Sequence, residues 1–229
     1  MRSGIEGVAF DLDGTLYPNY RLNIKLVPFI LKEWRLLAAF GKARRIIRIE
    51  QEGPSFAQNG FYERQAEIAA KILSVPEQPL KEKIDRLIYK GWEPLFKTIK
   101  LYKNAAETLA ALRGAGYKLG LLSDFPPETK LEYLGISSSL WDAVLCSEYS
   151  GALKPHPLSF KELAAAMSLP CEKILYVGNS RSYDVAGAAR AGMKTAWIKN
   201  ALFPGSGLKK PRPDFSFSNY RQLYQFMLN

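Results

Sequence analysis

Histidine and cysteine are scarce in this sequence, which limits the chemistry open to it. The 229 residues include one histidine, His156, and two cysteines, Cys146 and Cys171. A single histidine excludes multi-histidine metal sites, and it leaves nucleophile–histidine mechanisms only if they use that residue. The cysteines form no CxxC pair, so we expect inert, buried thiols and neither a zinc site nor a disulfide framework. Any chemistry must therefore rest mainly on carboxylates, lysines and hydroxyls.

Long hydrophobic runs are also missing. No apolar stretch approaches the roughly 20 residues that a membrane-spanning helix needs. Residues 1–3 lead directly into a strand-like segment with no signal-peptide pattern. Hydrophobic residues nevertheless make up 47% of the chain, which is enough to build a packed core. We therefore expect a cytoplasmic, globular protein with one large domain, or a core domain with a smaller one.

Acidic residues are in deficit: 22 stand against 32 lysines and arginines, a net charge of +10. Residues 21–50 hold much of the excess, with eight bases and two acids. Our preferred interpretation of this segment is a solvated helix face. The alternatives are recruitment of a polyanionic substrate, an anionic partner, or peripheral contact with an anionic membrane surface through the apolar and basic stretch from 26 to 48. We expect no nucleic-acid partner.

Strand-like and helical patterns alternate through most of the chain. An apolar run at 5–10 ends abruptly at Asp11, as a buried parallel strand does. From Asn104, a candidate helix N-cap, we expect helices at 104–113, 127–134, 157–168 and 182–191, alternating with strands at 118–122, 142–146, 173–177 and 194–198. A short strand near Phe215 and a helix from Asn219 follow. This order predicts an α/β fold with a Rossmann-like, doubly wound parallel sheet.

Residues 17–102 have a different pattern. Long helical periods run through this segment, interrupted at Gly53-Pro54 and at Val75-Pro76. The pattern indicates a helical subdomain inserted after the first strand. The core domain would then comprise residues 1–16 and 103–229.

Four of the expected strands are followed by small polar or charged residues. The segments are Asp11-Leu-Asp13-Gly-Thr15, Ser123-Asp124, Lys154-Pro155, and Gly178-Asn179-Ser180 with Asp184. Ligands of doubly wound folds bind at the carboxyl ends of the strands. Singly, each residue has a structural explanation as a turn, cap or surface residue. Together they are expected to converge on one site, with His156 as a helix-start residue near it.

This ordered set resembles the motifs of the haloacid dehalogenase superfamily, most of whose members are phosphatases. The most specific element is Asp11-Leu-Asp13-Gly-Thr15-Leu16-Tyr17, and Leu121-Leu122-Ser123-Asp124 and Gly151-Ala-Leu-Lys154-Pro155 follow in the right order. The resemblance covers nearly the whole chain. It places residues 17–102 where the family has an α-helical cap domain, which closes over the site and selects the substrate.

The resemblance implies a Mg²⁺-dependent phosphatase that hydrolyses a small phosphorylated metabolite. Asp11 would be the nucleophile that forms an aspartyl-phosphate, and Asp13 would be the general acid and base. Two unit negative charges about 4 Å apart repel by roughly 4 kcal/mol at an effective dielectric constant near 20. A carboxylate that attacks a phosphate dianion therefore needs nearby cations.

The remaining roles also follow from the resemblance. Mg²⁺ would be held by the Asp11 carboxylate, the Asp13 backbone carbonyl and the motif that contains Asn179 and Asp184. Lys154 would neutralise the phosphate and hold the nucleophile. Three further residues would form part of the substrate-binding site: Thr15 and Ser123 would contact the phosphoryl oxygens, and Asp124 would orient the loop after the second strand.

One position departs from the family pattern. The fourth motif commonly has an aspartate where this chain has Asn179. An amide oxygen can ligate Mg²⁺ but brings no charge, so we expect weaker metal binding at a preserved site. The alternative function is a weakly active or inactive binding protein that uses its basic cap to hold an anionic partner or a membrane surface. Asp13 favours phosphoryl transfer over dehalogenation, which needs neither this second aspartate nor a metal.

Overall fold

The computed structural model describes residues 4–53, 60–199 and 211–229. Six parallel strands form one sheet in the order β3-β2-β1-β4-β5-β6. The strands are β1 (Gly7–Phe10), β2 (Lys118–Ser123), β3 (Ala143–Cys146), β4 (Ile174–Gly178), β5 (Lys194–Ile198) and β6 (Phe215–Phe217). The chain builds outward from β1 in both directions, because β1 pairs with β2 on one side and β4 on the other. The predicted doubly wound α/β sheet is confirmed.

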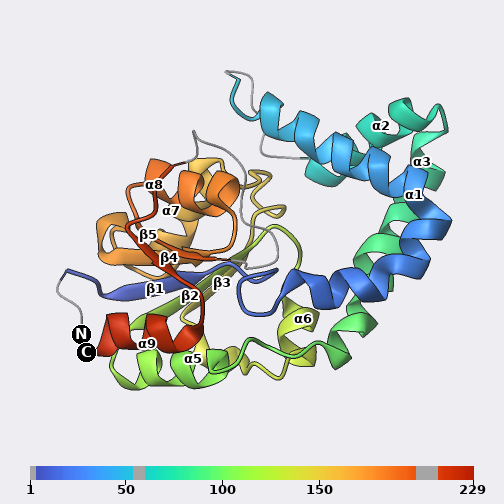
Figure 1. The fold of residues 1–229 in the computed structure, drawn as a ribbon. Coiled ribbons are helices and arrows are strands. Elements are labelled where there is room, and N and C mark those ends of the chain that lie inside the picture. Colours follow the sequence, from blue (N-terminus) through green and yellow to red (C-terminus); the bar gives the residue numbers. More distant parts are fainter. Residues whose placement is uncertain (1–3, 54–59, 200–210) are drawn as a thin grey trace.

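Helices cover both faces of the sheet, as Figure 1 shows. One face carries α5 (Ala105–Gly114) and α9 (Tyr220–Leu228), and the other carries α7 (Pro157–Ala166) and α8 (Ala186–Arg190). Alternate residues of β1 follow this division: Val8 and Phe10 join one hydrophobic cluster, whereas Ala9 joins the other. The buried strands thus pack against apolar helix faces on both sides.

Most predicted elements agree with the structure to within a few residues. The helix expected at 182–191 is divided into a π-helical turn, Arg181–Val185, and α8. The predicted N-cap position of Asn104 is confirmed. Asn104 occupies the N-cap position, but its backbone is left-handed with φ 65° and its side chain accepts no capping hydrogen bond. His156 does cap α7, through a hydrogen bond to its ring from the Leu158 N–H.

Both cysteines are free thiols. Cys146 is buried, as expected, and burial raises its pKa. Cys171 is only partly buried, which corrects the expectation that both are buried; it lies in a short 3-10 turn just before β4. Neither thiol is activated, since burial also raises the pKa of Cys171.

A helical insert, residues 19–98, lies between β1 and β2 and extends beyond the carboxyl ends of the strands (Figure 1). It contains α1 (Asn19–Glu50), α2 (Phe61–Leu73), α3 (Glu77–Ile84), a π-helical turn (Asp85–Tyr89), α4 (Lys90–Trp92) and a 3-10 helix (Glu93–Thr98). The insert has its own hydrophobic cluster, in which Leu36 and Phe40 of α1 meet Ile68 and Ile84. Helix α1 bends at Glu33. In the described ranges, no helix combines the length and the apolarity that crossing a membrane requires.

Candidate functional site

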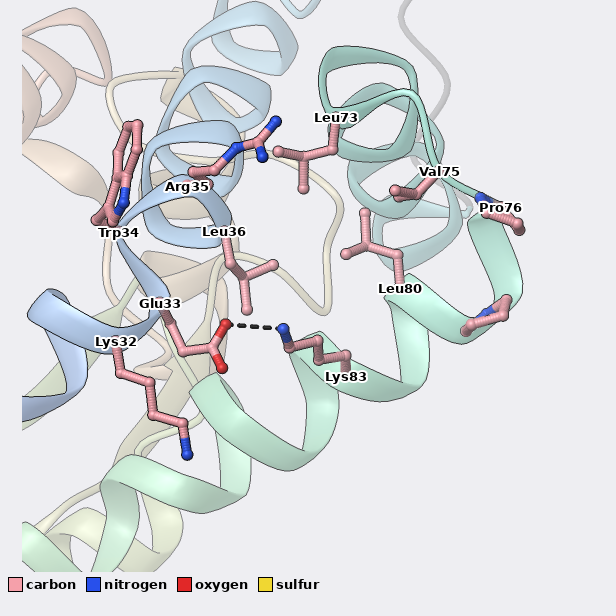
Figure 2. Close-up of a pocket in the computed structure, with 11 residues that line it drawn as sticks. Lys32, Glu33, Trp34, Arg35, Leu36, Leu73, Val75, Pro76, Leu80 and Lys83 are labelled. Carbon is pink, nitrogen blue, oxygen red and sulfur yellow. Dashed lines mark ion pairs between the residues drawn. The ribbon is translucent and has the colours of Figure 1, made fainter.

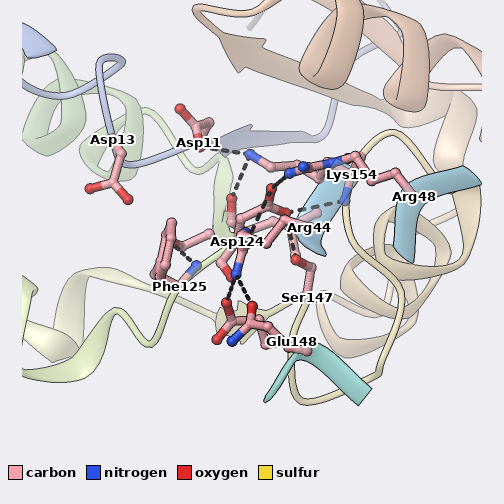
Figure 3. A network of polar contacts seen from close by, with 12 residues as sticks. Asp11, Asp13, Arg44, Arg48, Asp124, Phe125, Ser147, Glu148 and Lys154 are labelled. Carbon is pink, nitrogen blue, oxygen red and sulfur yellow. Dashed lines mark hydrogen bonds and ion pairs between the residues drawn. The ribbon is translucent and has the colours of Figure 1, made fainter. Parts of the chain in front are cut away.

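Lys154 joins two carboxylates that reach it from different strand ends. Its Nζ lies 2.6 Å from Asp11 Oδ1 and 2.8 Å from Asp184 Oδ1. Asp11 follows β1, Lys154 lies in the loop beyond β3, and Asp184 lies in the π-helical turn after β4. All three are buried, and Lys154 is only 3% exposed. The sheet topology therefore gathers these three residues as the sequence predicted, and Figure 3 shows the contact of Asp11 with Lys154.

This cluster holds two carboxylates for one ammonium group. Burial raises the pKa of Asp11 to about 7, since it outweighs the attraction of Lys154, and the Asp184 charge raises it further. Burial alone would lower the pKa of Lys154, but Asp11 and Asp184 raise it well above its ordinary value. Lys154 therefore stays charged, and the site has room for additional positive charge beside Asp11.

Two hydroxyl residues stand at the same strand ends. Thr15 Oγ1 donates a hydrogen bond of 2.7 Å to Asp11 Oδ2, and its side chain is fully buried. Ser123, also fully buried, accepts a hydrogen bond of 3.1 Å from the Phe125 N–H. Thr15 thus holds the Asp11 carboxylate, whereas Ser123 shapes the loop after β2.

Asp13 lies apart from the contact between Asp11 and Lys154, as Figure 3 shows. Its carboxylate accepts hydrogen bonds from Lys130 Nζ, at 2.8 and 3.1 Å, and from the Tyr17 hydroxyl. Lys130 belongs to α6 (Glu128–Tyr133) and is buried. Sequence reasoning missed this lysine. The only signal was its place on the helix that follows the second strand.

Asn179 packs on the turn of the first motif. Gly14 has φ +87°, and a Cβ there would lie 2.0 Å from Asn179 Nδ2 and 2.4 Å from Asn19 Nδ2. The Asn179 backbone carbonyl accepts a hydrogen bond of 2.9 Å from Trp197 Nε1. Gly178 packs as closely on Asp184, because a Cβ at Gly178 would lie 2.3 Å from Asp184 Cβ. The fourth motif is therefore fitted against the first.

The residues implied as metal ligands suit a hard cation. The described side chains include no group of three or more His, Cys, Asp and Glu with metal-binding placement. The implied set instead combines the carboxylates of Asp11 and Asp184 with the amide of Asn179 and the backbone carbonyl of Asp13. Oxygen donors of this kind, with two carboxylates at most, are what Mg²⁺ uses when it keeps several water ligands. The excess negative charge beside Lys154 fits the same ion.

Asp124 links the site to the helical insert. Its Oδ1 accepts hydrogen bonds from the Ser147 hydroxyl and, at 3.1 Å, from the Lys154 N–H, and its Oδ2 lies 2.7 Å from Arg48 Nη2. Arg48 Nε donates in turn to the Lys154 carbonyl at 2.7 Å. Burial alone would raise the pKa of Asp124, but Lys154, Arg48 and Arg44 lower it to about 2. Asp124 and Arg48 thus hold the Lys154 backbone from both sides.

Arg44 makes a second, deeper connection between α1 and the core. Its guanidinium forms an ion pair with the buried Glu148 and donates to the Asp124 carbonyl at 3.3 Å. It also lies 4.2 Å from the centre of the Phe125 ring. The expected solvated face is therefore wrong for Arg44 and Arg48, which are paired with acids of the core. Five other bases of the segment are exposed: Lys25, Lys32, Arg35, Lys42 and Arg45.

A cavity of about 150 Å³ lies between the insert and the core beside Asp13. Three charged residues line it: Asp13, Glu93 and Lys130. The rest of the lining is apolar or aromatic: Leu22, Ile88, Tyr89, Trp92, Phe96, Phe125 and Pro126. Trp92 Nε1 is buried and has no hydrogen-bond partner within the described chain. We call this cavity the chamber. It offers a guest molecule an apolar wall and one ammonium group.

Comparison with known proteins identifies phosphatases of similar length. The chain is 27% identical over 206 residues to the glyceraldehyde 3-phosphate phosphatase of Methanothermobacter thermautotrophicus, with 86% of this chain and 87% of the relative covered. It is 26% identical over 235 residues to the phosphoglycolate phosphatase of Salmonella paratyphi A, with 96% and 91% covered.

Solved structures share the fold. A HAD phosphatase from Thermococcus onnurineus superposes with a TM-score of 0.63 at 24% identity, covering 97% of both chains. The L-2-haloacid dehalogenase of Xanthobacter autotrophicus gives 0.67 at 18% identity, with 97% and 98% covered. The family model for haloacid dehalogenase-like hydrolases matches residues 5–192. The chain therefore belongs to the haloacid dehalogenase-like hydrolases, and its curated relatives place it among their phosphatases, the phosphoric monoester hydrolases.

Proposed function

We propose that this protein is a Mg²⁺-dependent phosphatase that hydrolyses a small phosphorylated metabolite through an aspartyl-phosphate on Asp11. The buried contact of Asp11 with Lys154 is the observation that carries the proposal. It fixes a carboxylate at the carboxyl end of β1 and places a permanent cation 2.6 Å from it. A nucleophilic carboxylate needs such a cation to approach a phosphate dianion.

In the first step, an oxygen of Asp11 forms a bond to phosphorus while the ester bond breaks. The leaving oxygen takes a proton from Asp13, which lines the chamber. In the second step, Asp13 takes a proton from a water molecule as that water attacks the phosphorus. The bond to Asp11 then breaks, inorganic phosphate leaves, and both aspartates return to their first state.

The surrounding side chains orient and neutralise the reacting groups. Lys154 offsets the charge of the phosphoryl oxygens, and Thr15 fixes the Asp11 carboxylate through its 2.7 Å hydrogen bond. Ser123 would contribute to phosphoryl binding through the loop that it shapes. Mg²⁺, held by Asp11, the Asp13 carbonyl, Asn179 and Asp184, would offset the repulsion between the nucleophile and the phosphate.

The chamber is proposed to hold the leaving group. With about 30 Å³ for one liquid water, its volume of about 150 Å³ admits roughly five non-hydrogen atoms. The substrates in the names of the relatives, glyceraldehyde 3-phosphate and phosphoglycolate, have leaving groups of about this size. When Asp13 carries the proton, Lys130 is free to pair with an anionic group of the substrate.

Residues 17–102 are proposed to form the cap domain over a core of residues 1–16 and 103–229. Leu22, Trp92 and Phe96 of the insert form walls of the chamber, so movement of the insert would open and close it. Closure would exclude water from the reacting groups. We place this activity in the cytoplasm. In the alternative function, an inactive protein would use the bases of the insert to bind an anionic partner. Arg44 and Arg48 are not available for this role, because acids of the core already pair with them.

The test is release of phosphate from an aryl phosphate, phosphoglycolate and glyceraldehyde 3-phosphate, with Mg²⁺ and with a chelator. We expect metal-dependent turnover in the native chain and a loss of about a thousandfold or more in Asp11→Asn. Asp142→Asn serves as the matched control, because Asp142 directly precedes β3, at the amino ends of the strands and away from the site at their carboxyl ends. Equal turnover in Asp11→Asn and the native chain would overturn the proposal. Equal turnover with and without the metal would overturn the Mg²⁺ assignment.

A further inference from the structure

The first half of α1 exposes an apolar stripe. Tyr20, Ile24, Val27 and Leu31 recur at intervals of four, three and four residues, so they share one face of the helix. Ile24 is 66% exposed and Leu31 is 75% exposed. Trp34, just beyond the bend at Glu33, is 62% exposed. Clustered apolar exposure of this kind marks an interaction surface, whereas single exposed residues do not.

Cations border this stripe. Lys25 and Lys32 directly follow Ile24 and Leu31 in the sequence, and Arg35 follows Trp34; all three bases are exposed. Across the described ranges, none of the three forms an ion pair. The nearest acid of the helix, Glu33, is already paired with Lys83 at 2.7 Å. The surface is therefore apolar and positively charged at the same time.

A hollow of about 410 Å³ continues this surface at the bend of α1. Figure 2 shows Lys32, Arg35 and Lys83 around it, with Leu36 and Leu80 forming part of its apolar wall and Trp34 directed away from Leu80. Lys32 and Arg35, which form no ion pair within the described ranges, thus stand next to a concave apolar surface. This combination suits a molecule with an anionic head and an apolar body.

We propose that this surface, formed by Tyr20, Ile24, Val27, Leu31 and Trp34 with Lys25, Lys32 and Arg35, docks the protein on an anionic lipid membrane. We call it the α1 outer face. Its apolar side chains would enter between the lipid headgroups, and its cations would pair with the headgroup phosphates and carboxylates. Trp34 would lie at the interface, where indole rings are favoured.

Charge complementarity favours a lipid surface over a second copy of this chain. A symmetric dimer uses the same patch on both subunits. Such a contact through the α1 outer face would bring its cations together with no acidic partner from the same patch. An anionic membrane offers the opposite charge over its whole area, and the net charge of +10 adds to this attraction. The inference reverses our preference for a purely solvated face in this part of α1.

The experiment is co-sedimentation of the full chain with vesicles. One set contains phosphatidylcholine alone, and the other is an equal mixture of phosphatidylcholine and phosphatidylserine. We expect binding to the mixed vesicles that added salt weakens. Each cation near such a surface strengthens binding about fivefold. We therefore expect binding to weaken about a hundredfold in the triple variant Lys25→Gln, Lys32→Gln and Arg35→Gln. The control triple is Lys103→Gln, Lys161→Gln and Lys194→Gln, at exposed positions elsewhere.

The apolar stripe has its own matched control on the same helix. Ile24→Ser with Leu31→Ser should abolish binding, while Ile49→Ser, at a position 74% exposed near the end of α1, should leave it intact. Circular dichroism and phosphatase activity verify that the variants fold. Tryptophan emission should shift to the blue on mixed vesicles, and Trp34→Phe should lose that shift.

Two outcomes overturn the proposal. The first is absence of binding to the mixed vesicles by the native chain. The second is a native dimer in sedimentation equilibrium that Ile24→Ser with Leu31→Ser converts to a monomer, because a second copy would then cover the α1 outer face. Neither outcome bears on the proposed phosphatase, whose turnover is measured without vesicles.

Discussion

Asn179 is the residue at which this chain departs from the usual metal motif of its family. Its amide packs against the Gly14 turn, 2.0 Å from where a Gly14 Cβ would lie. Asn179→Asp replaces the amide with a charged oxygen donor of the same shape. Because ligand charge tunes cation affinity, we expect this change to strengthen Mg²⁺ binding about tenfold. Calorimetric titration with Mg²⁺ measures the effect.

Asn19→Asp is the control for this prediction. The Asn19 amide also lies on the Gly14 turn, at 2.4 Å from the same position, but it is outside the fourth motif. A gain of equal size in both variants would show a general electrostatic effect and not a ligand role for Asn179. No gain in Asn179→Asp would contradict that role directly.

Lys130 is the residue that we expect to bind an anionic leaving group and so to distinguish it from an uncharged one. Lys130→Met should lower kcat/KM for phosphoglycolate at least tenfold, since a charge-assisted hydrogen bond in a buried site contributes about 1.5 to 3 kcal/mol. The loss should be smaller for 2-hydroxyethyl phosphate, which has an uncharged leaving group of similar size. Lys173→Met, at an exposed lysine far from the chamber, is the control. Equal losses for both substrates would mean that Lys130 acts only through Asp13.

Sequence reasoning found the residues at the strand ends and missed their partners on helices. Asp11, Lys154 and Asp184 could be predicted to meet because parallel strands end at one edge of the sheet. The contact between Lys130 and Asp13 joins residues 117 positions apart. No local pattern marks such a lysine, because its direction depends on how α6 packs beside the insert.

Helix α1 is the element that ties the insert to the core. The exposure of most of its bases could be predicted from the composition of the segment. The burial of Arg44 could not, since its partner Glu148 lies 104 positions away in the sequence. A helix with this many bases is expected to be solvated unless acids of another element face it. Those acids, Asp124 and Glu148, stand on the loops after β2 and β3, and only the folded chain brings them to α1.

The ion pairs between α1 and Asp124 should contribute stability that depends on pH. The folded pKa of Asp124 is about 2, below its ordinary value of 3.8. A lowered folded pKa stabilises the native state above the unfolded pKa, and this contribution is lost as pH falls from about 4 to about 2. The shift corresponds to about 2 kcal/mol at neutral pH. Urea unfolding of the native chain and of Asp124→Asn, over a pH series, measures it.

We expect Asp124→Asn to lower the free energy of unfolding at pH 7 by about 2 to 3 kcal/mol, because it also leaves Arg48 without its charged partner. The difference between the two proteins should shrink as the pH falls towards 2. Asp142→Asn, at another partly buried ion pair of the core, is the comparison. A difference that stays constant with pH would contradict the lowered pKa of Asp124.

At the scale of the whole molecule, the chamber exists only because two separately built units meet. The loop after β1 supplies Asp13, and α6 with its preceding loop supplies Lys130 and Phe125; the insert supplies Trp92 and Phe96. The fold class could be predicted from alternating strands and helices. The volume of the chamber could not, because it depends on how closely the insert approaches the core. That approach is set by Arg44 and Arg48, which hold α1 against the loops beyond β2 and β3.

The size of the chamber should decide which substrates are hydrolysed. Trp92→Ala removes most of one wall, so kcat/KM for a hexose 6-phosphate should rise about tenfold or more relative to kcat/KM for phosphoglycolate. The fit of a substrate group in a pocket of this kind contributes about 1 to 3 kcal/mol. Trp92→Phe keeps most of that wall, so it should change the ratio of the two kcat/KM values much less. Trp34→Ala, on the exposed part of α1, should leave the ratio unchanged. If Trp92→Ala also leaves it unchanged, the leaving group does not occupy the chamber, and the insert selects substrates elsewhere.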